Sequence, residues 1–246
     1  MMNENVKKIW ITGASSGIGK ALAIKFAKEG WKVAASARRE NLLNDLNNQN
    51  QNIYSFPVDV KNKDEVKNVF QNIIEKFKTI DISVFCTGIH DPDSEKKLSS
   101  EKIREIMETN FFGTLNCIMA VNTYFREKKN GHISIVSSVA GYRGLPAASG
   151  YCASKAALQL MTQTMAVEFG PYNVQANCIA PTVTMTPMGE SAWPPSPRRD
   201  AKLSKIPTGR FAEPDEVAKT VVFLASSQAD FINGIELPID GGEGAG

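Results

Sequence analysis

The chain has 246 residues, 42% hydrophobic and 22% charged, which are ordinary values for a globular protein. Its 28 basic and 26 acidic residues are mixed and leave a net charge of +2, which argues against a nucleic-acid or anionic-membrane partner. Four scattered cysteines without a C-x-x-C pair argue against zinc or a disulfide framework. The N-terminus lacks a signal peptide's apolar core, and no run approaches the ~18 apolar residues of a membrane span. We therefore expect a cytoplasmic protein.

Residues 6–30 predict a strand, a glycine-rich turn at 12–19 and an amphipathic helix, which is the opening of a βαβ unit. Gly13, Gly17 and Gly19 let the backbone turn sharply and approach a pyrophosphate, whose charge the amide groups and the following helix dipole would meet. A glycine turn alone is a weak signal. The strand before it and the helix after it favour dinucleotide binding over a merely structural turn.

The end of the second predicted strand, residues 31–37, bears on the choice of cofactor. An acidic side chain there would bind the ribose 2′-hydroxyl of NAD, but this chain has Arg38 and Arg39 instead. Guanidinium groups suit the 2′-phosphate of NADP, and the Ser15 hydroxyl could bind the same phosphate. The alternative is a solvated arginine pair at the start of a helix.

Two further strands complete the first half of the chain. Residues 52–60 predict a third strand, in which Asp59 either contacts an adenine edge or caps the next helix. Residues 81–88 predict a fourth strand that ends at Gly88, a second point of close approach for the cofactor. Repeated alternation of strand and helix indicates a parallel, doubly wound sheet.

Chemistry-bearing side chains gather between residues 138 and 155. Tyr151 and Lys155 are one turn apart on a predicted helix, so they share a face, and Ser138 follows a buried strand. We expect the ammonium group to favour the phenolate and to lower the Tyr151 pKa toward neutrality, so that Tyr151 can exchange a proton with an alcohol or ketone. A Tyr-x-x-x-Lys pair also arises by chance, so the spacing is not decisive alone.

Residues 99–128 predict one long helix with Asn110 in its middle. That amide either supports a kinked backbone carbonyl and a water that feeds protons to Lys155, or is a satisfied core asparagine. Residues 172–188 predict a further strand followed by Pro181, with a loop over the nicotinamide end of the cofactor.

Residues 182–210, here called the lid segment, interrupt the regular pattern with several prolines. Long irregular segments in compact domains commonly bind ligands, so Met188 and Trp193 are candidates for the substrate-facing wall; the alternative is that Trp193 only packs the segment down. A helix and a last strand follow. Without a repeat or a linker, residues 1–246 are expected to form one domain.

In these motifs the chain resembles the short-chain dehydrogenase/reductase family from about residue 6 to 242. TGASSGIG resembles the cofactor turn, and IPTGRFAEPDEVA and DGG resemble the closing segments. The residues that resemble the catalytic tetrad are Asn110, Ser138, Tyr151 and Lys155. The resemblance implies a single Rossmann domain with a mostly seven-stranded parallel sheet, helices on both faces, and a homotetramer. It implies Tyr151 as general acid, Ser138 orienting the substrate oxygen, Lys155 on the nicotinamide ribose and Asn110 in the proton relay, with no metal.

Three sets of site residues follow. The expected catalytic residues are Asn110, Ser138, Tyr151 and Lys155. The expected cofactor residues are Gly13, Ser15, Gly17, Ile18, Gly19, Arg38, Arg39, Asp59, Val60, Gly88, Tyr151, Lys155, Pro181, Val183 and Thr186. The expected substrate residues are Ser138, Tyr151, Met188 and Trp193.

The chain departs from the family pattern after the fourth strand. Where the family commonly has Asn-Asn-Ala-Gly, this chain has Phe85-Cys86-Thr87-Gly88, so only Gly88 carries over. The run PTVTMTPMG with a following Trp is similar to the dicarbonyl/L-xylulose reductase branch and related polyol and ketose reductases, which prefer NADPH. His90 is interpreted as a surface-loop histidine rather than a pocket residue.

These observations predict an enzyme that reduces a small ketose, dicarbonyl or similar ketone to the alcohol, reversibly and with NADP(H). One alternative is a 3-oxoacyl-thioester reductase that acts on an acyl carrier protein. Another is a non-catalytic dinucleotide-sensing protein, against which the intact tetrad argues. The natural substrate, the stereochemistry and the physiological direction do not follow from the sequence.

Overall fold

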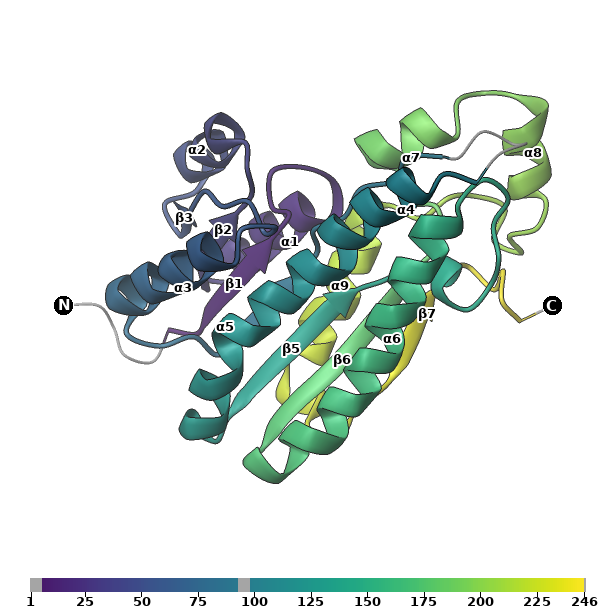
Figure 1. The fold of residues 1–246 in the computed structure, drawn as a ribbon. Helices are drawn as coiled ribbons and strands as arrows, with labels where there is room; N and C mark the ends of the chain where they lie inside the picture. The colour runs from purple at the N-terminus through teal and green to yellow at the C-terminus, as the bar shows by residue number, and fades with distance from the viewer. Residues whose placement is uncertain (1–5, 93–97, 246) are drawn as a thin grey trace.

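A parallel sheet runs through the middle of the molecule, whose computed structural model describes residues 6–92 and 98–245. Its strands are β1 (Lys8–Thr12), β2 (Lys32–Ser36), β3 (Ile53–Ser55), β4 (Ile82–Phe85), β5 (Gly131–Val136), β6 (Val174–Pro181) and β7 (Glu236–Ile239). They pair in the order β3-β2-β1-β4-β5-β6-β7 (Figure 1). The predicted seven-stranded, doubly wound sheet is confirmed.

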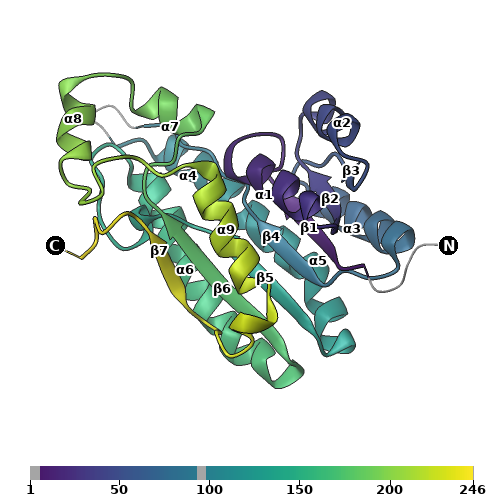
Figure 2. The same ribbon diagram turned by 180° about the vertical axis from the view of Figure 1, so that it is seen from behind.

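Helices cover both faces of this sheet (Figures 1 and 2). One face carries α1 (Gly17–Lys28), α2 (Glu40–Gln49) and α9 (Pro214–Leu224), and the other carries α3 (Lys63–Phe77), α5 (Gly113–Lys128) and α6 (Ser149–Phe169). Every residue of β1, β4 and β5 is therefore buried. Apolar residues dominate these strands, and their few polar residues, such as Ser83, His132 and Ser134, are buried as well.

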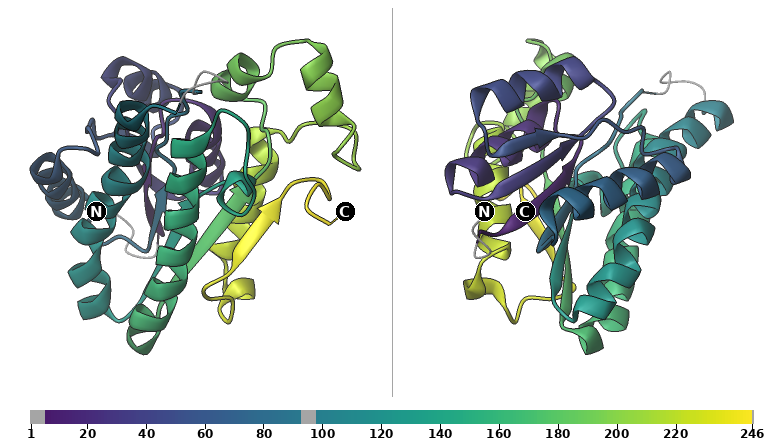
Figure 3. Two further views of the ribbon diagram at one scale, coloured as in Figure 1. Left: turned by 45° about the vertical axis from the view of Figure 1, so that its right-hand side comes forward. Right: turned by 90° about the vertical axis from the view of Figure 1, so that its left-hand side faces the viewer.

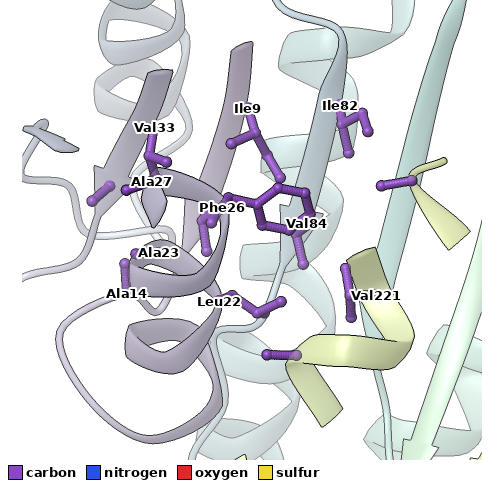
Figure 4. Packing of buried hydrophobic residues seen from close by; sticks show 14 of the residues in the cluster. Ile9, Ala14, Leu22, Ala23, Phe26, Ala27, Val33, Ile82, Val84 and Val221 are labelled. Atoms are coloured by element: carbon purple, nitrogen blue, oxygen red, sulfur yellow. The ribbon is translucent and has the colours of Figure 1, made fainter. Parts of the chain in front are cut away.

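The packing of α1 fixes the start of the fold. Leu22 and Phe26 of α1 lie against Ile9 of β1 and Val84 of β4, and Val221 of α9 closes the same cluster (Figure 4). All five side chains are fully buried. This contact holds the glycine-rich turn before α1 at the carboxyl end of β1.

The sheet reverses its order between β1 and β4, because β2 and β3 lie on one side of β1 and the later strands on the other. Ligands of doubly wound proteins bind outside the carboxyl ends of the strands at such a reversal. The short helices α7 (Pro187–Ala192) and α8 (Pro197–Leu203) lie beyond the carboxyl ends of β6 and β7 (Figures 1 and 3). The fold thus indicates a binding site at this edge of the sheet.

The helix predicted over 99–128 is present from Ser100 to Lys128, but a π-helical turn interrupts its middle. The segment forms α4 (Ser100–Met107), a π-helical turn at Glu108–Phe112, and then α5. Asn110 lies within the π-helical turn and is fully buried. One extra residue per turn there re-aims the backbone carbonyls, and π-turns of this kind are frequent at functional sites.

The third strand and the lid segment also differ from expectation. β3 ends at Ser55 rather than continuing to residue 60. The chain beyond it still lies beside the end of β2, because the backbone N–H groups of Phe56 and Val58 donate to the Ala35 and Ala37 carbonyls. In the lid segment, Pro187 and Pro197 begin helices instead of interrupting them. Each proline stands in the first turn, where no backbone N–H is needed, after a capping side chain of Thr186 or Ser196.

Two further observations concern the described residues as a whole. Among residues 6–92 and 98–245, no helix is both long and apolar enough to cross a membrane. In the same ranges, no three His, Cys, Asp or Glu side chains gather in a way that could hold a metal ion.

Candidate active site

The glycine-rich turn forms a cradle that a side chain would fill. Gly13 has a φ of 70°, and a Cβ there would lie 2.9 Å from the Cys86 carbonyl oxygen. A Cβ on Gly19 would collide with the Gly13 carbonyl oxygen. The helix α1 starts at Gly17, and its N-cap residue Ser16 makes no side-chain capping hydrogen bond. Close backbone approach and an uncapped helix N-terminus fit a pyrophosphate group.

The arginine pair after β2 faces this turn. Arg39 Nη2 donates to the hydroxyls of Ser15 at 2.8 Å and Ser16 at 2.9 Å, and Arg39 Nε donates to Ser15 at 3.2 Å. Arg38 lines the same cavity with an exposed side chain. A guanidinium and a hydroxyl together make a donor set for a phosphate. The residues present therefore fit the adenosine end of NADP.

A first cavity of about 370 Å³ runs from this turn to Tyr151 and Lys155. The expected cofactor residues that line it are Gly13, Ser15, Gly17, Ile18, Gly19, Arg38, Arg39, Asp59, Val60, Gly88, Tyr151, Lys155 and Thr186. Pro181 and Val183 line a second, adjoining cavity instead. Residues far apart in the chain thus meet along one cleft.

The two alternatives for Asp59 are partly resolved. Asn62 caps α3, because its side chain accepts a hydrogen bond from the Glu65 backbone N–H, so the capping role for Asp59 is wrong. Asp59 Oδ1 accepts a hydrogen bond from the Lys61 backbone N–H, and the residue lines the first cavity. The adenine contact stays a prediction.

Tyr151 and Lys155 lie in the first half of α6, beside the carboxyl end of β5. Lys155 Nζ donates to the Val136 carbonyl oxygen at 2.9 Å and lies 5.6 Å from the centre of the Tyr151 ring. Two hydrogen bonds tie α6 to the same strand end, from Ser137 Oγ to the Lys155 carbonyl and from Gln159 Nε2 to the Ser138 carbonyl. Because of these bonds, the reactive side chains are held by rigid elements.

The expected lowering of the Tyr151 pKa is wrong for this structure. Burial raises the pKa of Tyr151 to about 12, and the hydrogen bond with Ser138 offsets only part of that rise. Burial likewise lowers the pKa of Lys155, while the neighbouring Cys86 and Cys178 raise it. The rise of the Tyr151 pKa by desolvation therefore exceeds the lowering that the helical spacing from Lys155 predicts, and the phenol stays protonated at neutral pH.

The Asn110 side chain makes hydrogen bonds to α6 and to the chain that follows β4. Its Nδ2 donates to Ser154 Oγ and to the Ile89 carbonyl at 3.0 Å, and its Oδ1 accepts from the Ile89 backbone N–H at 2.8 Å. Its own carbonyl accepts from Thr114 Oγ1 at 2.8 Å. The side chain is thus a satisfied core amide, while the π-helical turn supplies the displaced backbone of the other alternative. The satisfied core amide is therefore present, whereas the water that feeds protons to Lys155 stays a prediction.

The second cavity, of about 580 Å³, adjoins the first at Tyr151. All four expected substrate residues line it, namely Ser138, Tyr151, Met188 and Trp193. His90 also lines it, with its ring centre 5.0 Å from that of Tyr151, so the surface-loop interpretation of His90 is wrong. The chain after Gly88 turns back over α6 because the Asn110 amide binds both backbone groups of Ile89.

Two basic residues of this cavity escaped the sequence argument. Arg198 and Lys202 of α8 line it, in a stretch that was expected to be irregular. The signal for α8 was available, since Ser196 followed by Pro197 is a typical helix start. Arg198 and Lys202 were not predicted as cavity residues because that helix start was not recognised.

Known proteins match nearly the whole chain. Residues 13–243 match the family model described as Enoyl-(Acyl carrier protein) reductase. The 3-oxoacyl-[acyl-carrier-protein] reductase of Thermotoga maritima is 36% identical over 236 residues, which cover 94% of this chain and 95% of that protein. The L-xylulose reductase of Caenorhabditis elegans is 35% identical over 241 residues, covering 96% and 95%. The solved structure "ElxO with NADP Bound" superposes with a TM-score of 0.91 at 28% identity, covering 98% of this chain and 100% of that one.

Proposed function

The chain belongs to the short-chain dehydrogenase/reductase family, and from that premise we propose that it reduces a small carbonyl compound to the alcohol, reversibly and with NADPH. The substrate class is a ketose, a dicarbonyl or a similar ketone. One observation carries the proposal: Tyr151 lines both cavities, so a single phenol faces the cofactor cleft and the substrate cavity.

The proposed mechanism needs two donors at the carbonyl oxygen. NADPH, when bound, supplies a hydride with its electron pair to the carbonyl carbon. Tyr151 transfers its phenolic proton to the carbonyl oxygen, and the Ser138 hydroxyl donates a hydrogen bond to that same oxygen. Lys155 binds the nicotinamide ribose, and the backbone of Asn110 joins the relay that returns a proton to Tyr151. Reduction requires the protonated phenol, and the raised pKa of Tyr151 is compatible with that form at neutral pH.

The choice of NADPH is supported by the arginine pair. Arg39 already bonds the Ser15 hydroxyl, and Arg38 lines the same end of the cleft. An NAD-specific site would offer an acceptor to the ribose 2′-hydroxyl there, whereas these residues offer donors. A solved relative whose description names bound NADP gives the same preference further support.

A 3-oxoacyl-thioester reductase is the second candidate, and the relative from Thermotoga maritima favours it. Both functions use the same chemistry at the carbonyl, so the substrate cavity must distinguish them. The lid segment, residues 182–210, lies over that cavity and carries much of its wall.

The decisive experiment follows NADPH absorbance with the purified protein across one panel of substrates. The panel holds L-xylulose, diacetyl, other small ketones and polyols, acetoacetyl thioesters and a 2-enoyl thioester. Turnover of small ketones or dicarbonyls above the thioesters supports the proposal. Turnover of acetoacetyl thioesters alone would support the second candidate instead, and turnover of the enoyl thioester alone would refute both.

We further propose that the protein is a cytoplasmic homotetramer of single-domain subunits. All four cysteines are free thiols, which suits a reducing compartment. Large apolar side chains are exposed on neighbouring helices, with Met119 on α5 and Leu160 and Val167 on α6. Apolar groups gathered on adjacent helices support a contact between copies of the chain.

A further inference from the structure

The charged side chains of the second cavity are of one sign. Among the described residues, Arg198 and Lys202 are the Lys or Arg side chains that line it, and no described Asp or Glu does. Both stand on α8, on the lid segment. Whether these charges act on a substrate depends on what else neutralises them.

Lys202 pairs with the carboxylate of Glu243, which does not line the cavity. Its Nζ donates to Oε1 of Glu243 at 2.5 Å, and Arg143 Nη1 donates to the same oxygen at 2.9 Å. Thr182 Oγ1 donates to the other carboxylate oxygen. The Glu243 and Lys202 side chains are 3% and 9% exposed, so this pair is buried and satisfied. Glu243 thereby anchors α8 to the C-terminal segment and already pairs with the Lys202 ammonium, although the cluster of Glu243 with Lys202 and Arg143 keeps one net positive charge.

Arg198 is different. Its guanidinium carbon lies 4.5 Å from the Trp193 ring centre, and the described part of the chain offers it no ion pair. The Trp193 backbone is held because Arg199 Nη1 donates to the Trp193 carbonyl at 3.1 Å, and the indole ring packs near Phe211 with the ring centres 6.3 Å apart. Stacking on a fixed indole restricts the guanidinium while leaving its N–H fork unused, which lowers the entropic cost of binding an anion.

We propose that the substrate carries an anionic group, a carboxylate or a phosphate monoester, away from the carbonyl that is reduced, and that Arg198 binds this group. The inference rests on the proposed function, because it assumes that the second cavity holds the substrate. Arg198 is then a specificity-determining residue, and the anchored α8 sets its position. Guanidinium and carboxylate or phosphate form paired, charge-assisted hydrogen bonds, which neutral ketones cannot make.

The test compares ketones that differ only in charge. The pairs are acetoacetate, 4-oxopentanoate and 5-oxohexanoate, each against its methyl ester, and fructose 6-phosphate against fructose, all with NADPH at low salt. We expect at least one anion to exceed its neutral partner by about tenfold in kcat/KM, mainly through KM. The length of the preferred acid reports the spacing, and the sugar pair distinguishes phosphate from carboxylate.

Two variants assign the effect. Arg198→Gln should bring the preferred pair to near equality by raising KM far more for the anion than for the neutral partner, while the affinity for NADPH stays the same. Lys205→Gln removes an equal charge from an exposed position near the end of α8 and should keep the preference. About 0.5 M salt should weaken the preference of the unmodified protein.

Equal use of anion and neutral partner in every pair would overturn the inference and show Arg198 to be a solvated surface arginine. In that case, turnover of the neutral ketones would still support the proposed function. An equal loss for anion and neutral partner in Arg198→Gln would also overturn it. If an acyl-carrier-protein thioester were the favoured substrate and alone lost turnover in Arg198→Gln, the arginine would serve an acidic protein and the inference would be wrong. Absence of turnover with every carbonyl tested would instead refute the proposed function.

Discussion

Tyr151 shows how burial changes the chemistry of one residue. Helical spacing places Lys155 one turn away, and that spacing alone predicts an acidified phenol. In the structure Lys155 donates to the Val136 carbonyl, and desolvation raises the pKa of Tyr151 to about 12. Carbonyl reduction needs the protonated phenol, which is the form of an ordinary tyrosine at neutral pH, and burial extends that form to higher pH while making the phenol a weaker acid.

The pH dependence of the two directions tests this account. Reduction needs the protonated phenol, so kcat/KM should stay level from about pH 6 to about pH 9 and fall only as pH approaches the raised pKa. Oxidation of the alcohol needs the phenolate, so it should rise over the same range. Steady-state rates in overlapping buffers measure both. A fall in reduction centred near neutrality would mean that the charge of Lys155 dominates after all.

The arginine pair sets the second expectation at this scale. For the unmodified protein we expect kcat/KM with NADPH to exceed that with NADH by at least about tenfold, which is about 1.4 kcal/mol. Arg38→Ala should remove much of this preference, and Arg39→Ala should do so as well because Arg39 orients the Ser15 hydroxyl. Equal use of both cofactors by the unmodified protein would contradict the assignment.

Some residues of the candidate site could be predicted from the sequence, and others could not. The glycines, Tyr151 and Lys155 could be found from local patterns, because turn geometry and helical spacing are local properties. His90 could not, since its place beside Tyr151 depends on the Asn110 amide holding Ile89, 21 positions away. Glu243 could not either, because its three partners come from three other segments.

At the scale of elements, the lid segment depends on a buried ion pair. Removing one partner of such a pair leaves the other charge buried and costs about 3 kcal/mol or more. Glu243→Gln should therefore destabilise the protein by about that amount and raise KM for the carbonyl substrate while the affinity for NADPH stays the same. Urea unfolding and steady-state kinetics measure the two effects.

Two companion variants make this test specific. Lys202→Met combined with Glu243→Gln should cost less than the sum of the single changes, because the buried Lys202 ammonium is then no longer left without its carboxylate and only the more exposed Arg143 loses its partner. Asp215→Asn breaks the exposed Asp215–Lys219 pair, whose side chains are 57% and 61% exposed, and should cost less than about 1 kcal/mol. Additive costs for Lys202 and Glu243 would show that the pair does not hold α8.

The elements differ in how well their sequence predicts them. The strands and α1 follow from apolar runs and a glycine turn, and most agree with expectation to within a few residues. The break between α4 and α5 does not, because ETNFF keeps a helical pattern and only tertiary packing selects a π-helical turn there. The lid helices were missed because proline was taken as a helix breaker, although at the first turn it favours a helix.

For the whole molecule, the order of strands could be anticipated from the alternation of strands and helices, since right-handed crossovers leave few topologies. Assembly could not, because exposure of a helix face is known only once the fold is known. Val167 is 78% exposed on α6, and an apolar group so placed is easily buried by a second copy of the chain.

The proposed tetramer gives the expectation at this scale. Val167→Lys places a charge on the exposed apolar face and should lower the assembly state measured by light scattering after size-exclusion chromatography. Gln71→Lys adds the same charge to an exposed polar position of α3 and should leave the mass unchanged. A monomeric mass for the unmodified protein would refute the tetramer.

The central claim is that Tyr151 supplies the proton in an NADPH-dependent carbonyl reduction. Its most direct test measures NADPH oxidation with the best carbonyl of the panel for the unmodified protein and for Tyr151→Phe, alongside NADPH affinity from cofactor fluorescence. Phenylalanine keeps the ring and removes only the hydroxyl, so we predict a loss of about a thousandfold or more in kcat with NADPH affinity unchanged. Unchanged NADPH oxidation by Tyr151→Phe would contradict the account.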